Sequence, residues 1–130
     1  MAKTDAQMEL LFKALADRTR LRLLNLMAAG EVCVCFFVEV LGTSQPKISR
    51  HLAYLRRAGV VAARREGKWM HYRITTPESQ HAARVFDEVM TWLGEDRDMQ
   101  KDRARMQAVC CAPRMPVRLQ GAPRPSGLGA

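Results

Sequence analysis

The chain has 130 residues, 48% of them apolar, which is enough for one folded domain with a modest core and short tails. Its net charge of +8 and pI near 9.9 favour a polyanionic partner such as nucleic acid. No apolar run reaches the roughly 20 residues of a membrane span, and no signal-peptide arrangement precedes the first predicted helix. We therefore expect no membrane partner and a reducing compartment, where the 4 cysteines are more typical of thiol ligands or a redox switch than of disulfides.

The chain begins with two predicted core helices. Apolar residues follow helical spacing over residues 6–16, and Asp17 is placed to cap a second helix over residues 18–28. The second helix is apolar on more than one face, so we expect it to lie centrally in the core.

A short amphipathic helix that carries Cys33 and Cys35 is predicted over residues 31–41, before a turn at Gly42. On a regular helix, two side chains that are two residues apart point in directions that differ by about 200°. One ion could then bind both sulfurs only by unwinding or bending the helix, which would be a way to switch the protein.

Residues 44–59 predict a helix that reads DNA. Ser44 is placed to cap its first turn with its side chain, Pro46 suits that turn, and Gly59 suits the left-handed position after the end. One face is apolar and the others are polar or basic, with candidate DNA contacts from Ser44, Gln45, Lys47, Ser49, Arg50, His51 and Tyr54. A solvated surface helix is the alternative, but the preceding helix and short turn favour a helix-turn-helix.

Residues 60–74 predict two strands around Glu66 and Gly67. Such a hairpin would carry Arg64, Arg65 and Lys68 to the sugar-phosphate backbone while the preceding helix enters the major groove. The predicted fold is therefore a winged helix-turn-helix, mainly α with a small β-hairpin (α+β).

A long amphipathic helix follows over residues 78–92 and ends near Gly94. Its wide apolar stripe has little to cover in so small a domain, so we expect it to pair with a second copy in a homodimer. We divide the chain into a DNA-binding and dimerisation domain (1–94), a charged, solvated helical extension with Cys110 and Cys111 (95–112) and a disordered tail rich in Pro, Gly and Arg (113–130).

Several of these segments resemble the ArsR/SmtB family of bacterial metal-responsive transcriptional repressors. The resemblance covers about residues 8–93 and rests on LFKALADRTRLRLLNLM, on EVCVCFFVEVL, which is similar to the ELCVCDL motif of the arsenic- and cadmium/lead-sensing branches, and on LGTSQPKISRHLAYLRRAGVVAARREGKWMHYRI. It implies a cytoplasmic homodimer, joined through its first and last helices, that binds operator double-stranded DNA and leaves it on binding a ligand.

The resemblance also implies that Cys33 and Cys35 are thiolate ligands for As(III) or Sb(III), which are thiophilic. The arsenic-sensing pattern has a third cysteine at the position of Val38, which this chain lacks. Either Cys110 or Cys111 supplies the third sulfur, from the same or the partner subunit, or the inducer needs only two thiolates, as a monomethylated arsenical would. A buried cysteine without a sensing role is the structural alternative.

Other functions remain as alternatives. Lead and cadmium sites of the family recruit cysteine from the N-terminal arm, and residues 1–32 contain none; the spacing of His81, Asp87 and Glu88 does not match the family's zinc pattern. A thiol-redox-responsive repressor and a constitutive DNA-binding protein stay open. An enzyme is disfavoured, since neither a C-x-x-C motif nor a phosphate-binding loop occurs.

Overall fold

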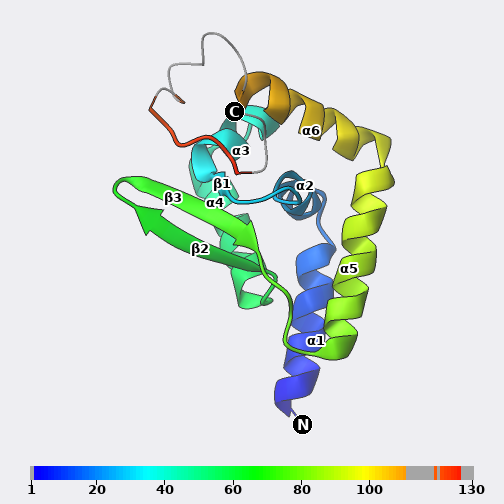
Figure 1. The fold of residues 1–130 in the computed structure, drawn as a ribbon. Helices are drawn as coiled ribbons and strands as arrows, with labels where there is room; N and C mark the ends of the chain where they lie inside the picture. The colour runs from blue at the N-terminus through cyan, green and yellow to red at the C-terminus, as the bar shows by residue number, and fades with distance from the viewer. Residues whose placement is uncertain (1, 111–118, 120, 127–130) are drawn as a thin grey trace.

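The computed structural model describes residues 2–110, 119 and 121–126, with side chains from residue 7 onward. In order, its elements are α1 (Ala2–Leu15), α2 (Arg18–Leu26), β1 (Val32–Cys33), α3 (Val34–Leu41), α4 (Gln45–Arg57), β2 (Val61–Glu66), β3 (Trp69–Ile74), α5 (Gln80–Glu95) and α6 (Arg97–Cys110) (Figure 1). This is the predicted winged helix-turn-helix, in which α3 and α4 are the two helices of the motif and β2 and β3 the wing. No helix in the described part of the chain has both the length and the apolar character to cross a membrane.

Local signals set most of the helix ends. The Asp17 carboxylate accepts a hydrogen bond from the Arg20 N–H at 3.0 Å, which confirms the predicted cap of α2. Gly59, with φ of 81°, follows the end of α4 as predicted. Ser44 stands at the N-cap of α4 with extended backbone, but its side chain makes no capping hydrogen bond, so that predicted role is wrong.

The sheet has one strand more than the sequence predicts. Its order is β1-β3-β2, all antiparallel, and β1 pairs Val32 with Tyr72 and Cys33 with His71. The predicted helix over residues 31–41 is therefore wrong at its start, because α3 begins only at Val34. The apolar residues before it instead pair with the open edge of β3, which satisfies backbone groups that a helix end would leave unpaired.

The core lies between α2, α3 and α4. Ile48, Leu52 and Leu55 are fully buried, which confirms the apolar stripe predicted for α4. They meet Leu23, Leu24, Phe36 and Phe37, which have no exposed surface. The buried stripe fixes which side of α4 faces outward.

The helix α6 differs from the predicted solvated extension. It packs on α2 and α3 (Figure 1). Its residues Met99, Met106 and Cys110 are buried. Arg22 donates to both oxygens of Asp102 at 2.7 and 3.0 Å, so the charged face of α6 is also anchored. These contacts join residues about 80 positions apart, which no local pattern indicates.

Part of the C-terminal segment also differs from the predicted disordered tail. Leu119 and Pro125 are buried, and the Ser126 N–H donates to the Glu31 carbonyl at 2.8 Å. The rest of the predicted tail lies outside the described residues, and so does Cys111 of the predicted extension.

Candidate thiol site and nucleic-acid interface

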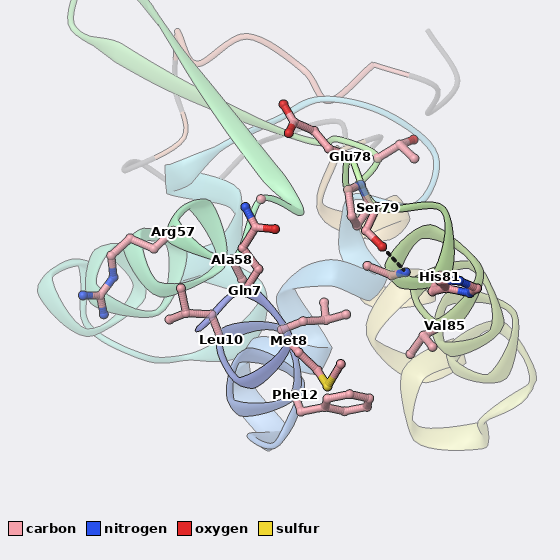
Figure 2. Close-up of a pocket in the computed structure, with 15 residues that line it drawn as sticks. Gln7, Met8, Leu10, Phe12, Arg57, Ala58, Glu78, Ser79, His81 and Val85 are labelled. Carbon is pink, nitrogen blue, oxygen red and sulfur yellow. Dashed lines mark hydrogen bonds between the residues drawn. The ribbon is translucent and has the colours of Figure 1, made fainter. Parts of the chain in front are cut away.

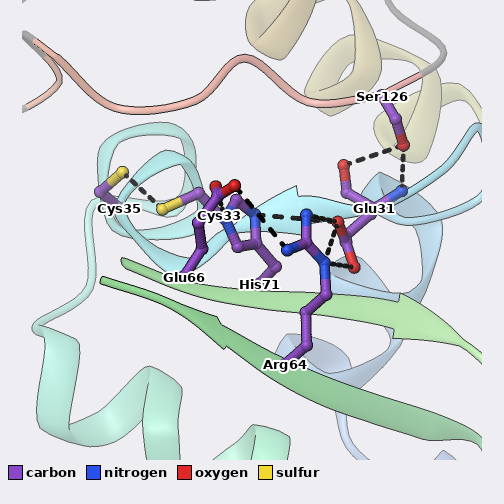
Figure 3. A network of polar contacts seen from close by, with 7 residues as sticks. All are labelled: Glu31, Cys33, Cys35, Arg64, Glu66, His71 and Ser126. Carbon is purple, nitrogen blue, oxygen red and sulfur yellow. Dashed lines mark hydrogen bonds and ion pairs between the residues drawn. The ribbon is translucent and has the colours of Figure 1, made fainter. Parts of the chain in front are cut away.

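Cys33 and Cys35 lie at the junction between strand β1 and helix α3. Cys33 ends β1 with extended backbone (φ −72°, ψ 140°), whereas Cys35 is in the first turn of α3. Their sulfurs are 3.2 Å apart (Figure 3). The prediction that the two thiols diverge by about 200° is therefore wrong, since only one of them is helical. No unwinding is needed to bring both sulfurs to one ion.

The two thiols differ in acidity. The Cys35 thiol donates a hydrogen bond to the Cys33 sulfur, and this bond lowers the pKa of Cys33 to about 6, although the burial of Cys33 opposes the shift. The same hydrogen bond, together with burial, raises the pKa of Cys35. The lowered pKa favours a Cys33 thiolate beside the Cys35 thiol donor, an arrangement that suits nucleophilic attack on a thiophilic centre.

The 3.2 Å separation can be compared with the sulfur–sulfur distances that different coordination geometries require. With a metal–thiolate bond of about 2.3 Å, two sulfurs bound at a right angle lie about 3.3 Å apart, at a tetrahedral angle about 3.8 Å and in a linear complex about 4.6 Å. The pair is therefore closest to the bite of a pyramidal centre with a lone pair, such as trivalent arsenic or antimony. Tetrahedral zinc or cadmium and linear mercury would have to spread the sulfurs.

A polar cluster lies beside the thiol pair (Figure 3). His71, which is buried, contacts Glu66 through Nε2 at 3.0 Å and Glu31 through Nδ1 at 3.9 Å. Arg64 binds Glu31 with Nη2 to Oε1 at 2.7 Å, and this hydrogen-bonded guanidinium lowers the pKa of the Glu31 carboxyl. Sequence reasoning did not assign a role to Glu31, because its partners come from distant strands.

The source of a third ligand is only partly described. Cys110 is buried at the end of α6, a helix that contacts α3, while Cys111 lies outside the described residues. Within residues 7–110, 119 and 121–126, no three His, Cys, Asp or Glu side chains are grouped so that they could hold a metal ion.

The predicted DNA contacts of α4 fall into two groups. Four of the seven side chains are exposed on the outer face and at the beginning of α4, namely Ser44, Gln45, Lys47 and Arg50. A fifth, Ser49, is half-buried. His51 and Tyr54 instead face the first two helices, where the Arg20 guanidinium lies 3.4 Å from His51 Nδ1 and 4.3 Å from the centre of the Tyr54 ring. These two side chains hold α4 in place, and sequence reasoning missed Arg20, their partner.

The three basic wing residues are all exposed. Arg65 has its side chain on the face of β2 opposite to Arg64, and Lys68 lies over the Trp69 ring at 4.9 Å. Arg64 alone among them is bound to a carboxylate within the described residues.

An apolar surface runs along α1 and α5. Phe12 is 53% exposed, and Trp92 is 71% exposed. A groove of about 690 Å³ lies between α1, the end of α4 and the start of α5, with Met8, Leu10 and Val85 in its walls (Figure 2). Exposed apolar surface of this extent is typical of a protein contact.

A helix-turn-helix whose second helix presents polar and basic side chains, followed by a basic wing, is typical of transcriptional regulators that bind DNA. The sequence pattern described as "Bacterial regulatory protein, arsR family" matches residues 17–63. The chain is 47% identical over 91 residues to the arsenical resistance operon repressor of Escherichia coli K12, which covers 69% of this chain and 76% of the relative. It therefore belongs to the ArsR family of transcriptional regulators, which are not enzymes.

The solved structures that share the fold include two transcriptional regulators. One is a homodimeric winged helix-turn-helix domain of Mb0332 from Mycobacterium bovis, a possible ArsR-family regulator, with 35% identity and a TM-score of 0.59 over 72% of this chain and 84% of that one. The other is AntR, an antimony-specific transcriptional repressor, with 29% identity and a TM-score of 0.55 over 73% and 84%.

Proposed function

We propose that this ArsR-family protein is a cytoplasmic homodimer that represses transcription by binding operator DNA and is released when trivalent arsenic or antimony bonds to Cys33 and Cys35. The observation that carries the proposal is the 3.2 Å separation of the two sulfurs in a chain related to an arsenical resistance operon repressor. Release requires only that the metalloid bind the DNA-free conformation better than the DNA-bound one.

The ligand joins two structural elements. Cys33 belongs to β1, which pairs with β3 of the wing, whereas Cys35 belongs to α3, which packs on α4. A metalloid bonded to both sulfurs would tie the wing to the helix-turn-helix in one fixed orientation. This linkage replaces helix unwinding as the proposed route from sensor to DNA.

The coordination number separates two forms of inducer. A monomethyl arsenical needs only the Cys33 and Cys35 thiolates, whereas arsenite takes a third ligand, for which Cys110 or Cys111 of either subunit are the candidates. Serine at both C-terminal cysteines should weaken the response to arsenite and spare the response to the methylated form. Equal loss of both responses would mean that these cysteines do not act as the third ligand of arsenite.

Operator contact is assigned to α4 and the wing. We propose that Ser44, Gln45, Lys47, Ser49 and Arg50 reach the major groove and that Arg65 and Lys68 bind phosphates. The apolar surface of α1 and α5, with Phe12 and Trp92, would join two subunits about a two-fold axis. Two copies of α4 would then meet a palindromic site in successive turns of the groove.

The test is fluorescence anisotropy of the reduced protein on its promoter DNA, titrated separately with arsenite, a monomethyl arsenical, cadmium, zinc and mercuric ion. We expect release by the arsenicals at the lowest concentrations, and Cys33→Ser or Cys35→Ser should bind DNA normally but ignore them. Tight binding that no arsenical disturbs would refute the proposal. So would induction that persists without both cysteines.

The DNA face needs its own controls. Lys47→Ala and Arg50→Ala should each lose operator affinity while the dimer stays folded, whereas Lys101→Ala, which removes an exposed charge from α6, should change affinity little. Unchanged operator binding by the two α4 variants would show that Lys47 and Arg50 do not contact the DNA.

A thiol-redox-responsive repressor is the second candidate, and the same sulfur pair supports it. A low-pKa thiolate 3.2 Å from a second thiol is arranged for oxidation by a peroxide to a disulfide, with water as the leaving product. Release of DNA by peroxide, at concentrations where arsenite has no effect, would favour this function over the first.

A further inference from the structure

From the ion pair between Glu31 and Arg64 we infer that the Glu31 carboxylate and operator phosphate compete for Arg64, so that Arg64 is a positioning residue that links the thiol pair to the wing. The inference rests on the proposed function, because it concerns regulation of the same site. It modifies the expected role of Arg64, which the sequence places simply among the phosphate contacts.

The first observation is a row of side chains across the sheet. Cys33 on β1 is paired with His71 on β3, and His71 is paired with Arg64 on β2. Directly paired residues of antiparallel strands place their side chains on the same face and in contact distance. The sensor thiol, the buried histidine and the wing arginine are thus successive neighbours in one row.

The second observation is how Arg64 is held. Its Nε lies 2.9 Å from each carboxylate oxygen of Glu31, and Nη2 lies 2.7 Å from Oε1, while Glu66 is 4.0 Å from Nη1 (Figure 3). An arginine fork that is filled by one carboxylate cannot offer the same N–H groups to a phosphate. Binding a phosphate through the Nε and Nη2 edge of Arg64 therefore requires that this edge leave Glu31.

The third observation is that Glu31 is itself anchored next to the thiols. It lies two positions before Cys33, its side chain is 19% exposed, and its carbonyl accepts from the Ser126 N–H at 2.8 Å. A ligand that fixes Cys33 also fixes the short segment that carries the carboxylate. Metalloid binding would then hold Glu31 where it captures Arg64 and withdraws it from DNA.

The neighbour Arg65 supplies a matched control. It is exposed on the other face of β2, opposite Met70, and no carboxylate within the described residues is in ion-pair distance of it. Arg64→Ala and Arg65→Ala should each reduce the salt dependence of operator binding by about one phosphate contact. Only Arg64→Ala should also reduce the loss of affinity that arsenite causes. Equal arsenite responses in the two variants would overturn the inference.

The direct test is a double-mutant cycle of operator affinity without arsenite. Glu31→Gln should tighten binding about two- to five-fold, the range expected for release of one exposed ion pair. In an Arg64→Ala background the same change should have no effect. Tightening that persists there, or equal tightening in Glu95→Gln at another exposed carboxylate, would be a general effect of removing negative charge and would overturn the inference.

The outcome can be separated from failure of the proposed function. If wild-type protein binds the operator but ignores every arsenical, the proposed function fails, and the cycle on Glu31 and Arg64 still reports whether carboxylate and phosphate compete. If the wild type responds and the cycle is additive, only the inference fails. Circular dichroism of each variant establishes that it is folded before either result is used.

Discussion

Replacing Arg20 with alanine should both destabilise the fold and loosen α4, the helix proposed to read DNA. Its guanidinium donates to the carbonyls of Lys13 and Ala14, both at 2.8 Å, and lies over the Tyr54 ring of α4. It therefore ties the end of α1 to the helix proposed to read DNA.

The size of the effect follows from these contacts. A hydrogen bond from a charged donor contributes about 1.5–3 kcal/mol when it is shielded from water, and the bond to Lys13 is exposed and worth less. Stacking on a partly buried ring adds about 0.5–1 kcal/mol. We expect the free energy of unfolding to fall by about 2–4 kcal/mol. For a domain whose whole stability is about 5–15 kcal/mol, this loss is large.

The assay is urea unfolding followed by circular dichroism at one fixed protein concentration, because the stability of a dimer depends on concentration. Arg18→Ala is the control, since its ion pair with Asp98 is exposed on both sides and is expected to contribute at most about 1 kcal/mol. Arg20→Lys should lose nearly as much as Arg20→Ala, because a lysine cannot donate to two carbonyls with a planar fork. A loss for Arg20→Ala no greater than for Arg18→Ala would refute the reasoning.

Three further changes test other parts of the molecule. Cys35→Ala removes the donor that stabilises the Cys33 thiolate, so the pKa of Cys33 should rise from about 6 toward the ordinary value of about 8.5. Thiolate absorbance is followed against pH in a background that lacks the other two cysteines. With Cys35 present the absorbance should disappear as the pH falls through 6, and in the Cys35→Ala variant it should disappear at a higher pH. Gly30→Ala should displace the C-terminal segment, because Gly30 has φ of 154° and a Cβ there would meet Ser126; hydrogen exchange of the Ser126 amide should become faster. Phe12→Glu should dissociate the dimer in analytical ultracentrifugation, and an intact dimer would place the interface elsewhere.

The parts of the fold that were predictable carry their signals locally. Asp17 before α2, Gly59 after α4 and the spacing of Ile48 and Leu52 each act within a few residues of where they stand. Caps, left-handed ends and buried stripes depend on the backbone of one element and little else. This is why the order of helices and the hairpin could be read from the sequence.

The start of α3 could not be predicted in the same way. A strand of only Val32 and Cys33 exists because β3, about 40 residues later, offers it an unpaired edge. Val32 and Cys33 before a helix are compatible with either conformation. The wrong start of the helix also gave the wrong geometry for the thiol site, because a helix through both cysteines would direct the two sulfurs apart.

The helix α6 shows a second limit of prediction from the sequence. Met99, Met106 and Cys110 are 7 and 4 positions apart and form one stripe, but charged residues dominate between them. Asn25, buried in α2, accepts from Arg103 at 2.6 Å and donates to the Met99 carbonyl at 2.8 Å. A polar residue satisfied by a distant helix leaves no mark in the sequence that would distinguish α6 from a solvated helix.

The position of the thiols also determines which structural elements a bound ligand could act on. If both cysteines belonged to one helix, binding would deform that helix and the signal would depend on strain. With Cys33 on β1 and Cys35 on α3, the bonds instead join a strand paired to the wing with a helix packed on α4. Each element proposed to contact DNA is then one step from the site, and a single metalloid could act on both. Losing either sulfur removes this linkage altogether, so one cysteine variant should be as unresponsive as the double variant.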